Sequence, residues 1–210
     1  MQKQLAILIL ALFVAQIAAF GVKQPACKNK EFKPVDLDIE QYMGRWYEQY
    51  ASGTVKDTFE KNCVCVNANY SLNEDDNVNV YNYCYNTEND AKQGIEGTAY
   101  VQDEGSLYVS FDVPFAWVQN YFAENYGYSN YQIGYISEDY QLVIVVSCNP
   151  LYGYPLLSEI GSDMIWVMTK QQEISDEQLK LVQNWFTENN FKWGSMQKTN
   201  QGKDCIYQSD

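Results

Sequence analysis

Histidine is absent from this chain of 210 residues. Histidine is the commonest general base and metal ligand near neutral pH, so its absence excludes Ser–His–Asp catalysis, Cys–His catalysis and the H-E-x-x-H type of zinc enzyme. The cysteines include no C-x-x-C pair, and a single residue separates Cys63 from Cys65, which is a poor spacing for chelation. Carboxylate pairs remain, but the acidic residues cluster in turns such as "NEDDN", where solvation explains them. The sequence therefore predicts no catalytic residue, no metal site and no cofactor.

Basic residues are scarce. The 14 lysines and arginines stand against 27 aspartates and glutamates, which gives a formal net charge of −13. An acidic protein repels nucleic acid and anionic lipid surfaces. Nucleic acid is therefore excluded as a partner.

Long apolar runs are also rare: the chain has one, which follows Lys3 and extends from Leu5 to about Phe20. The run is shorter than the roughly 20 apolar residues that a membrane span needs, although a membrane anchor is the alternative. A basic start, a short apolar run and small residues at its end are typical of a secretory signal peptide. We therefore predict a signal peptide over 1–19, one domain over 20–210, and a secreted, extracellular protein.

The cysteines and one short motif agree with export. The chain has six cysteines, and an even number in an oxidising compartment indicates disulfides. The segment "NYS" at Asn69 is a sequon for N-glycosylation.

Short segments with alternating side chains follow one another from Gly44 to Lys170, with turns between them. In one of them, Val78 and Val80 share one face and three tyrosines share the other. The eight segments are "GRWYEQYA", "CVCVNANYSL", "VNVYNYCYN", "GIEGTAYVQD", "SLYVSFDV", "YQIGYIS", "QLVIVVSC" and "DMIWVMTK". They predict an all-β fold, an eight-stranded antiparallel up-and-down β-barrel over about 42–171. A barrel of this size has room for one small ligand.

The pattern then changes to helical spacing. Leu179, Val182 and Phe186 recur on one face, and Ser175 with Gln178 forms a capping box. We expect one amphipathic α-helix over about 175–190, packed on the outside of the barrel. The polar tail that follows, to residue 210, would be held in place only by a disulfide.

Several motifs occur in a fixed order along the chain. They are "YMGRWYE" with Gly44 and Trp46, "ANYSL" at 68–72, "EGTAYV" at 96–101, "EDY" at 138–140 before "LVIVVSC", and "IWVMTKQ" before "ISDEQ". Together with eight strands and one late helix, this set resembles the lipocalin family. More narrowly, it resembles the branch of apolipoprotein D, insect bilin-binding protein and the bacterial outer-membrane lipocalins, over roughly Cys27 to Cys205.

The resemblance implies structural roles for the motif residues. Trp46 would plug the closed end of the barrel, with a basic residue after the last strand over its ring. That residue is Lys170 here, where most members have arginine, so we expect a weaker contact. Asp139 and Tyr140 match the second family motif, whose first position departs as Glu138.

The resemblance also implies two disulfides, Cys27–Cys148 and Cys65–Cys205. Cys63 and Cys84 have no counterpart in the basic family pattern. They lie on neighbouring predicted strands but not directly opposite each other, so a third disulfide would need a β-bulge.

Alternation predicts which side chains face the interior. If Ala68 and Tyr70 point inward, Cys65 and Asn69 point outward, as a disulfide and a glycan both require. Carried through the other strands, this register predicts the ligand-binding residues Val66, Ala68, Tyr70, Val78, Val80, Asn82, Gly97, Ala99, Leu107, Val109, Phe111, Ile133, Tyr135, Val143, Val145, Trp166 and Met168. Small residues beside aromatic ones leave space for a ligand. The alternative is a solid core, because pockets and cores use the same residue types.

Two connections, 112–131 and 149–163, carry many aromatic and leucine side chains, among them Trp117 and Phe122. In an up-and-down barrel both would lie at the open mouth. They either form a hydrophobic mini-core that orders a long loop, or a lid that makes transient contact with lipid surfaces.

We therefore predict a secreted, non-catalytic carrier of a small hydrophobic ligand such as a fatty acid, lysolipid, sterol, retinoid or bilin. The alternatives are an enzyme of the same fold that acts on a lipid-like substrate, and a solid barrel that serves as a protein-interaction or inhibitor module. The sequence leaves the identity of the ligand and the oligomeric state open.

Overall fold

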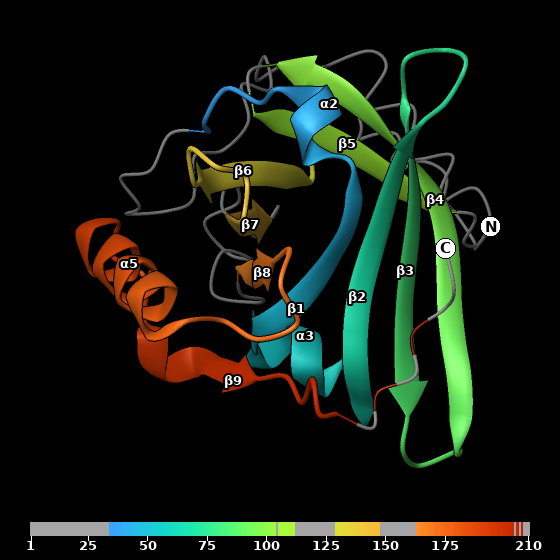
Figure 1. Cartoon of the computed structure of the whole chain (residues 1–210), viewed down its shortest axis with the longest axis vertical. Helices are drawn as coiled ribbons and strands as arrows, with labels where there is room; N and C mark the ends of the chain where they lie inside the picture. The colour runs from blue at the N-terminus through green and yellow to red at the C-terminus, as the bar shows by residue number, and fades with distance from the viewer. Residues whose placement is uncertain are drawn as a thin grey trace, which may run out of the picture.

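The strands of this protein curve around a common interior (Figure 1). The structure is a computed structural model, and it describes residues 34–103, 105–111, 129–147, 163–203, 205 and 207. The strands are β1 (Gly44–Ser52), β2 (Cys63–Leu72), β3 (Val78–Asn86), β4 (Ala91–Asp103), β5 (Ser106–Phe111), β6 (Tyr131–Ile136), β7 (Leu142–Ser147), β8 (Met164–Thr169) and β9 (Met196–Lys198). The helices are α2 (Ile39–Tyr42), α3 (Gly53–Asp57), α5 (Asp176–Glu188) and the 3-10 turn η2 (Trp193–Ser195).

The sheet closes on itself. Its strand order is β2-β3-β4-β5-β6-β7-β8-β1-β9, and β2 also pairs with β1. Every registered pair is antiparallel, so the predicted eight-stranded up-and-down barrel is confirmed. Helix α2 lies at one end of the barrel and α3 at the other (Figure 1).

Helix α5 confirms the second structural prediction. The Ser175 hydroxyl accepts from the Gln178 backbone N–H at 3.2 Å, and the Gln178 side chain accepts from the Ser175 N–H at 3.0 Å. This capping box satisfies two backbone donors at the start of the helix. Val182 and Phe186 are buried against the outside of β6, β7 and β8, as their spacing predicts.

A ninth strand, β9, was not predicted, because three residues of mixed polarity carry no periodic signal. It pairs with the second half of β1, for example Tyr50 with Lys198, whereas β2 pairs only with Gly44–Tyr47. We call this place, where β1 changes partner from β2 to β9, the seam. The tail crosses it: Gln201 donates to the carbonyls of Glu48 at 2.7 Å and Val66 at 2.6 Å.

A β-bulge in β2 stands beside the seam. The pairing of β2 with β3 shifts between Val64 and Asn67, and Cys65 has a left-handed φ of 56°. The bulge allows two disulfides to form at neighbouring positions, Cys63–Cys84 and Cys65–Cys205. The resemblance implied Cys65–Cys205, whereas the sequence left the pairing of Cys63 with Cys84 open and noted the bulge that this bond would need. The predicted Cys27–Cys148 bond lies outside the described residues.

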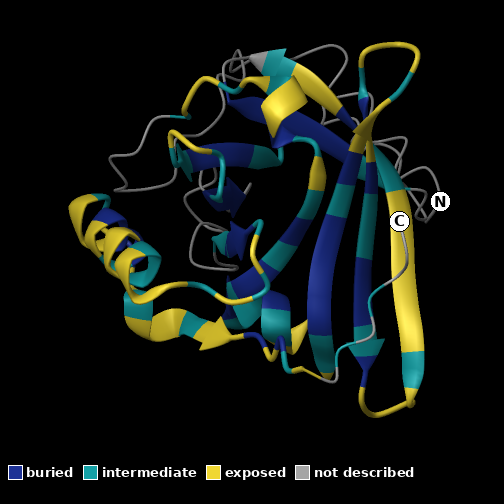
Figure 2. Cartoon of the chain, in the orientation of Figure 1, coloured by how far each residue is buried: buried dark blue, intermediate teal, exposed yellow. Residues whose placement is uncertain are grey.

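Apolar side chains form two separate clusters. The interior cluster lies inside the barrel and includes Trp46 and residues from β2 to β8. The outer cluster lies between α5 and β6–β8 and includes Trp185 and Phe186. The inner positions of β2 and β3 are buried, while most of β4 is exposed (Figure 2).

Candidate functional site

The barrel interior is the candidate functional site, and most predicted ligand-binding residues lie there. Thirteen of them belong to the interior cluster or pack against it: Ala68, Tyr70, Val78, Val80, Ala99, Leu107, Val109, Phe111, Ile133, Val143, Val145, Trp166 and Met168. Asn82 pairs with Ala68 across β2 and β3 and is partly buried, so it shares this face. Whether these residues bind a ligand stays a prediction.

Tyr135 lies elsewhere, so its predicted place in the interior is wrong. The register of β6 with β7 shifts between Ile133 and Tyr135, which turns Tyr135 outward. Its ring packs in the outer cluster, and Ile136 takes the inward position instead. A one-residue irregularity reverses every later side chain of a strand, and simple alternation cannot detect it.

Two further predicted residues have different surroundings from those expected. Val66 is buried but belongs to neither cluster, because it lies in the bulge of β2 beside the seam. At Gly97 the missing side chain does not leave free space. A Cβ there would come within 2.7 Å of the Phe111 ring, so this aromatic ring occupies the space over the glycine.

The closed end of the barrel has the predicted contact between Trp46 and Lys170, which we call the floor lock. The Lys170 ammonium lies 4.4 Å from the centroid of the Trp46 ring, and it donates to the carbonyls of Met43 and Tyr42. The Trp46 indole donates to the Tyr42 carbonyl at 2.8 Å. Gly44, the first residue of β1, has a φ of +92°, which favours glycine. Burial lowers the pKa of Lys170 to about 8.

The second motif also has a structural role at this end. The Ser137 hydroxyl donates to the Asp139 carboxylate at 2.6 Å, and this hydrogen bond lowers the pKa of Asp139. The Tyr140 hydroxyl accepts from the backbone N–H of Asp38 at 2.9 Å. The turn between β6 and β7 is thereby attached to the segment that begins α2.

Three tyrosine hydroxyls meet inside the barrel, and two of these residues were missed from the sequence. The Tyr131 hydroxyl lies 2.6 Å from that of Tyr42 and 3.1 Å from that of Tyr70. We call Tyr42, Tyr70 and Tyr131 the tyrosine triad. Tyr131 stands two positions before Ile133 on the same strand, so alternation already indicated that it faces inward.

A charged cluster of Glu48, Lys56 and Glu60 was also missed. Glu48 is only 1% exposed and pairs with Met168, whose side chain belongs to the interior cluster, so Glu48 faces inward as well. Lys56 donates to both carboxylates, to Glu60 at 2.6 Å. Burial, together with the nearby Glu48 charge, raises the pKa of Glu60 to about 8, although Lys56 opposes the shift. The sequence already indicated that Glu48 faces inward, because Glu48 follows Trp46 by two positions on the same strand.

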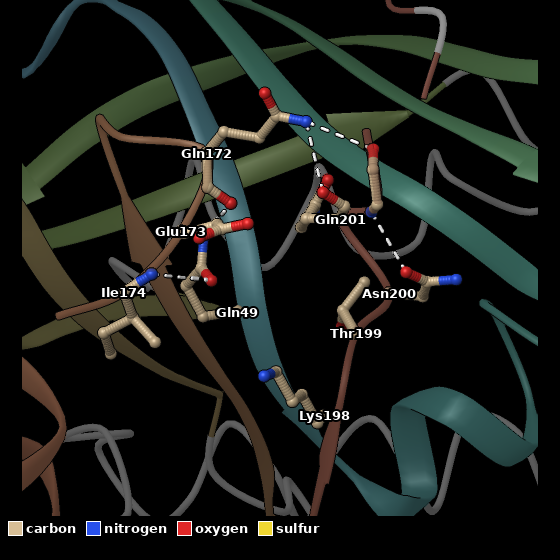
Figure 3. Close-up of a pocket in the computed structure, with 9 residues that line it drawn as sticks. Gln49, Gln172, Glu173, Ile174, Lys198, Thr199, Asn200 and Gln201 are labelled. Carbon is tan, nitrogen blue, oxygen red and sulfur yellow. Dashed lines mark hydrogen bonds between the residues drawn. The ribbon is translucent and has the colours of Figure 1, made fainter. Parts of the chain in front are cut away.

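A polar pocket of about 470 Å³ lies where β1, the segment after β8 and the tail after β9 meet (Figure 3). Its side-chain amides already have partners. Gln49 donates to Thr169 at 2.9 Å. Gln49 also accepts from the Ile174 N–H at 3.2 Å, and Gln172 donates to the Gln201 carbonyl at 3.1 Å (Figure 3). These hydrogen bonds attach the tail to the barrel. The pocket therefore has a structural explanation and is not the candidate ligand site.

Other predictions fall on the outer surface or on parts that the structure leaves out. Asn69 is partly exposed, on the opposite face of β2 from the triad residue Tyr70, and accepts from Arg45 at 3.0 Å. Glycosylation of Asn69 stays a prediction. The two mouth connections lie almost entirely outside the described residues. Within the described part, no three acidic or cysteine side chains are grouped to hold a metal, and no helix is long and apolar enough to cross a membrane.

A closed eight-stranded antiparallel barrel, plugged by a locked tryptophan and covered on one side by a C-terminal helix, defines a lipocalin-type protein. The family model for the lipocalin-like domain matches residues 37–201, and the chain belongs to this family.

Several known proteins resemble this chain. The outer membrane lipoprotein Blc of Citrobacter freundii is 30% identical over 145 residues, which cover 68% of this chain and 67% of the relative. Apolipoprotein D of Macaca fascicularis is 27% identical over 212 residues, with 93% and 96% covered. Among solved structures, insecticyanin from the tobacco hornworm Manduca sexta shares the fold, with a TM-score of 0.63 at 15% identity over 85% of this chain and 87% of that one.

Proposed function

We propose that this protein is a secreted, non-catalytic carrier that holds a small hydrophobic molecule inside its barrel. The observation that carries the proposal is the apolar wall contributed by each of the strands β2 to β8 and enclosed by the floor lock. Burial of an apolar ligand against such a wall is favourable by about 25 cal/mol per Å². The ligand classes that suit it are fatty acids, lysolipids, sterols, retinoids and bilins.

Export is part of the proposal. It is supported by the apolar run before Phe20 in the sequence and by the two disulfides of the described part. The absence of catalysis is supported by the cysteine chemistry. The four cysteines that the structure describes are all in disulfides, so none of these four is a free thiol nucleophile.

Transient contact of the mouth with neutral lipid surfaces also belongs to the proposal. Strands β1 and β5 run in the same direction, so the segment after β1 lies at the same end of the barrel as Phe111, the last residue of β5. In that segment, Phe59 is 77% exposed, which is unusual for a phenylalanine and suits contact with lipid. The net charge of −13 favours neutral or zwitterionic surfaces over anionic ones.

Organic extraction of the purified protein followed by mass spectrometry tests the carrier proposal, and titration with a fluorescent fatty-acid analogue complements it. Trp166 is partly exposed and packs against the interior cluster, so the analogue should quench its emission. Trp166→Ala should weaken binding. Trp193→Phe is the matched control, because Trp193 packs in the outer cluster. If extraction yields no ligand and no analogue binds the folded protein, the barrel is a solid interaction module instead.

A further inference from the structure

The buried charged cluster beside the seam has one negative charge too many. Glu48 of β1, Lys56 of α3 and Glu60, which follows α3, bring two carboxylates to a single ammonium. Their side chains are 2%, 9% and 14% exposed, so solvent and salt screen this imbalance only weakly. One further positive charge would make the cluster neutral.

One oxygen of the cluster shows where that charge is missing. Oε1 of Glu48 accepts from the Lys56 ammonium and from the Thr199 hydroxyl, and Oε2 of Glu60 accepts from Lys56 at 2.6 Å. Oε2 of Glu48 is buried and accepts no hydrogen bond. In the part of the chain that the structure describes, it is the one buried side-chain oxygen or nitrogen without a partner. Burial of a charged acceptor without a donor is strongly unfavourable.

A proton on Glu60 supplies both the charge and the missing donor. The Glu60 carboxyl lies within hydrogen-bonding reach of the Glu48 carboxylate, but two ionised carboxylates have no proton to share. Protonated Glu60 has one O–H, which Glu48 Oε2 can accept. Burial, the Glu48 charge and this hydrogen bond raise the pKa of Glu60 to about 8, although the Lys56 charge opposes the shift. Glu60 is therefore mostly protonated at neutral pH.

The other charges around Glu60 are fixed or exposed. Burial lowers the pKa of Lys56, but the two carboxylates together raise it above the ordinary value, so the ammonium keeps its charge. Strand β8, which also contacts α3, has no ionisable side chain. The remaining charged groups on the neighbouring elements and turns are exposed to solvent: Asp57, Lys61, Glu88, Lys198 and Lys203. Titration of the cluster near neutral pH therefore belongs to Glu60.

The cluster attaches the segment between β1 and β2 to the barrel wall. We call residues 53–62 the mouth segment, because α3 lies at the end of the barrel opposite α2 and the floor lock (Figure 1). Within it, the Glu60 N–H donates to the Val55 carbonyl at 3.0 Å, which holds the Glu60 and Lys56 side chains on one compact turn. Both side chains contact Glu48 of β1. The state of this contact therefore affects the mouth.

We propose that Glu60 donates a proton to Glu48 Oε2, and that this proton holds the mouth segment against β1. When the proton leaves, the two carboxylates repel each other, the mouth segment separates from β1, and the ligand can exchange. This inference rests on the proposed carrier function and adds its regulation: the barrel retains its ligand in acidic and neutral solution and releases it in alkaline solution.

The size of the effect follows from the proton balance. Once the mouth segment opens, the solvated Glu60 carboxyl regains its ordinary acidity and loses its proton. Opening therefore releases one proton, so the opening equilibrium constant should rise up to about tenfold per pH unit between about pH 5.5 and 7.5. The rise should level off above the folded pKa of about 8.

Two measurements on the purified protein test the proton without any ligand. The infrared C=O band of a protonated carboxyl group should be present at pH 7, and it should be absent in Glu60→Gln, which cannot ionise but still offers an N–H to Glu48. The amides of Glu60 and Cys63 donate to carbonyls of the mouth segment. Their hydrogen-exchange protection factors, which correct for the intrinsic pH dependence of exchange, should fall by up to about tenfold per pH unit in the wild type and stay constant in Glu60→Gln. Asp57→Asn is the matched control, because it removes an exposed carboxylate of the same segment and should keep the wild-type behaviour.

The third measurement is the dissociation rate of the neutral fluorescent probe N-phenyl-1-naphthylamine, followed by stopped flow. The rate should rise with pH over the same range in the wild type and in Asp57→Asn, and it should be independent of pH in Glu60→Gln. A missing acid band at pH 7 overturns the shared proton, and protection factors that do not change with pH overturn the closure. A dissociation rate that is independent of pH in the wild type overturns the regulation of exchange. If the probe does not bind at all, the carrier function is refuted, while the infrared band and the protection factors still decide whether the proton closes the mouth segment.

Discussion

Gly134 lies directly against the Trp185 ring of α5, so a single added carbon atom at this position would collide with the helix. A Cβ at Gly134 would lie 2.7 Å from Cζ2 and 3.1 Å from Cη2 of the Trp185 ring, whereas ordinary contact begins at 3.4 Å. The indole cannot easily move away. Its N–H donates to the Gly134 carbonyl at 3.1 Å, and its ring is stacked on Phe191 at 5.2 Å. Gly134→Ala must therefore displace the helix or the strand.

The expected loss follows from these contacts. Overpacking of a rigid core typically lowers the free energy of unfolding by about 1–3 kcal/mol, and loss of the indole hydrogen bond adds about 1 kcal/mol. The sum, about 2–4 kcal/mol, corresponds to a decrease in Tm of about 5–15 °C for a domain of this size. Urea and thermal denaturation followed by circular dichroism measure both quantities.

Two further variants complete the test. Gly194→Ala is the control, because a Cβ there meets no atom within 4 Å, and its effect should stay within about 0.5 kcal/mol. Trp185→Phe removes the two ring atoms that collide, so Gly134→Ala should be less destabilising in that background than in the wild type. If Gly134→Ala leaves stability unchanged, or if the two substitutions are additive, α5 does not dock on β6 as described.

Three other expectations follow from the described contacts. Lys170→Ala should lower the free energy of unfolding by roughly 0.5–2 kcal/mol, and Lys170→Arg should keep or raise this free energy. A large loss of ligand affinity in folded Lys170→Ala would place this residue in the binding site instead. Because the pKa of Glu60 is raised from 4.5 to about 8, the folded protein binds the extra proton, so stability should fall as the pH rises from 4.5 to 8. Glu60→Gln should flatten this part of a stability-versus-pH profile measured by urea denaturation, and an unchanged slope would contradict the assignment. Replacement of both Cys65 and Cys205 by serine should lower stability by about 2–5 kcal/mol in the same assay, and no loss would mean that the tail is held by its hydrogen bonds alone.

Much of the barrel could be predicted because its strands obey strict alternation, which places Val143 and Val145 inside and Ile144 under α5. Successive side chains of a strand point to opposite faces, so only one register of strand pairing buries all the apolar side chains. The apolar pattern therefore determines the fold. The floor lock was equally accessible, because Trp46 and Lys170 occur in recognisable motifs, one in the first strand of the barrel and the other directly after its eighth strand.

Two of the failures share a physical cause, which is a departure from regular strand pairing. The irregularity after Ile133 reversed Tyr135, and the bulge at Cys65 removed Val66 from the interior face. The triad was only partly found because Tyr42 lies on a helix of four residues, which carries no periodic signal. Glu48 was passed over because charged residues are rarely buried, and the contacts with Lys56 and Thr199 explain its position.

The seam also constrains the order in which the chain can fold. β1 is made early, but it is paired with β8 and β9, which are made last. Cys63–Cys84 spans 21 residues and can form while synthesis continues, whereas Cys65 must wait for Cys205, which is 140 residues away. During that interval, Cys65 competes with its neighbour Cys63 for the thiol of Cys84. Correct maturation therefore depends on a Cys65 that stays reduced, or is released by thiol–disulfide exchange, until the C-terminal tail arrives.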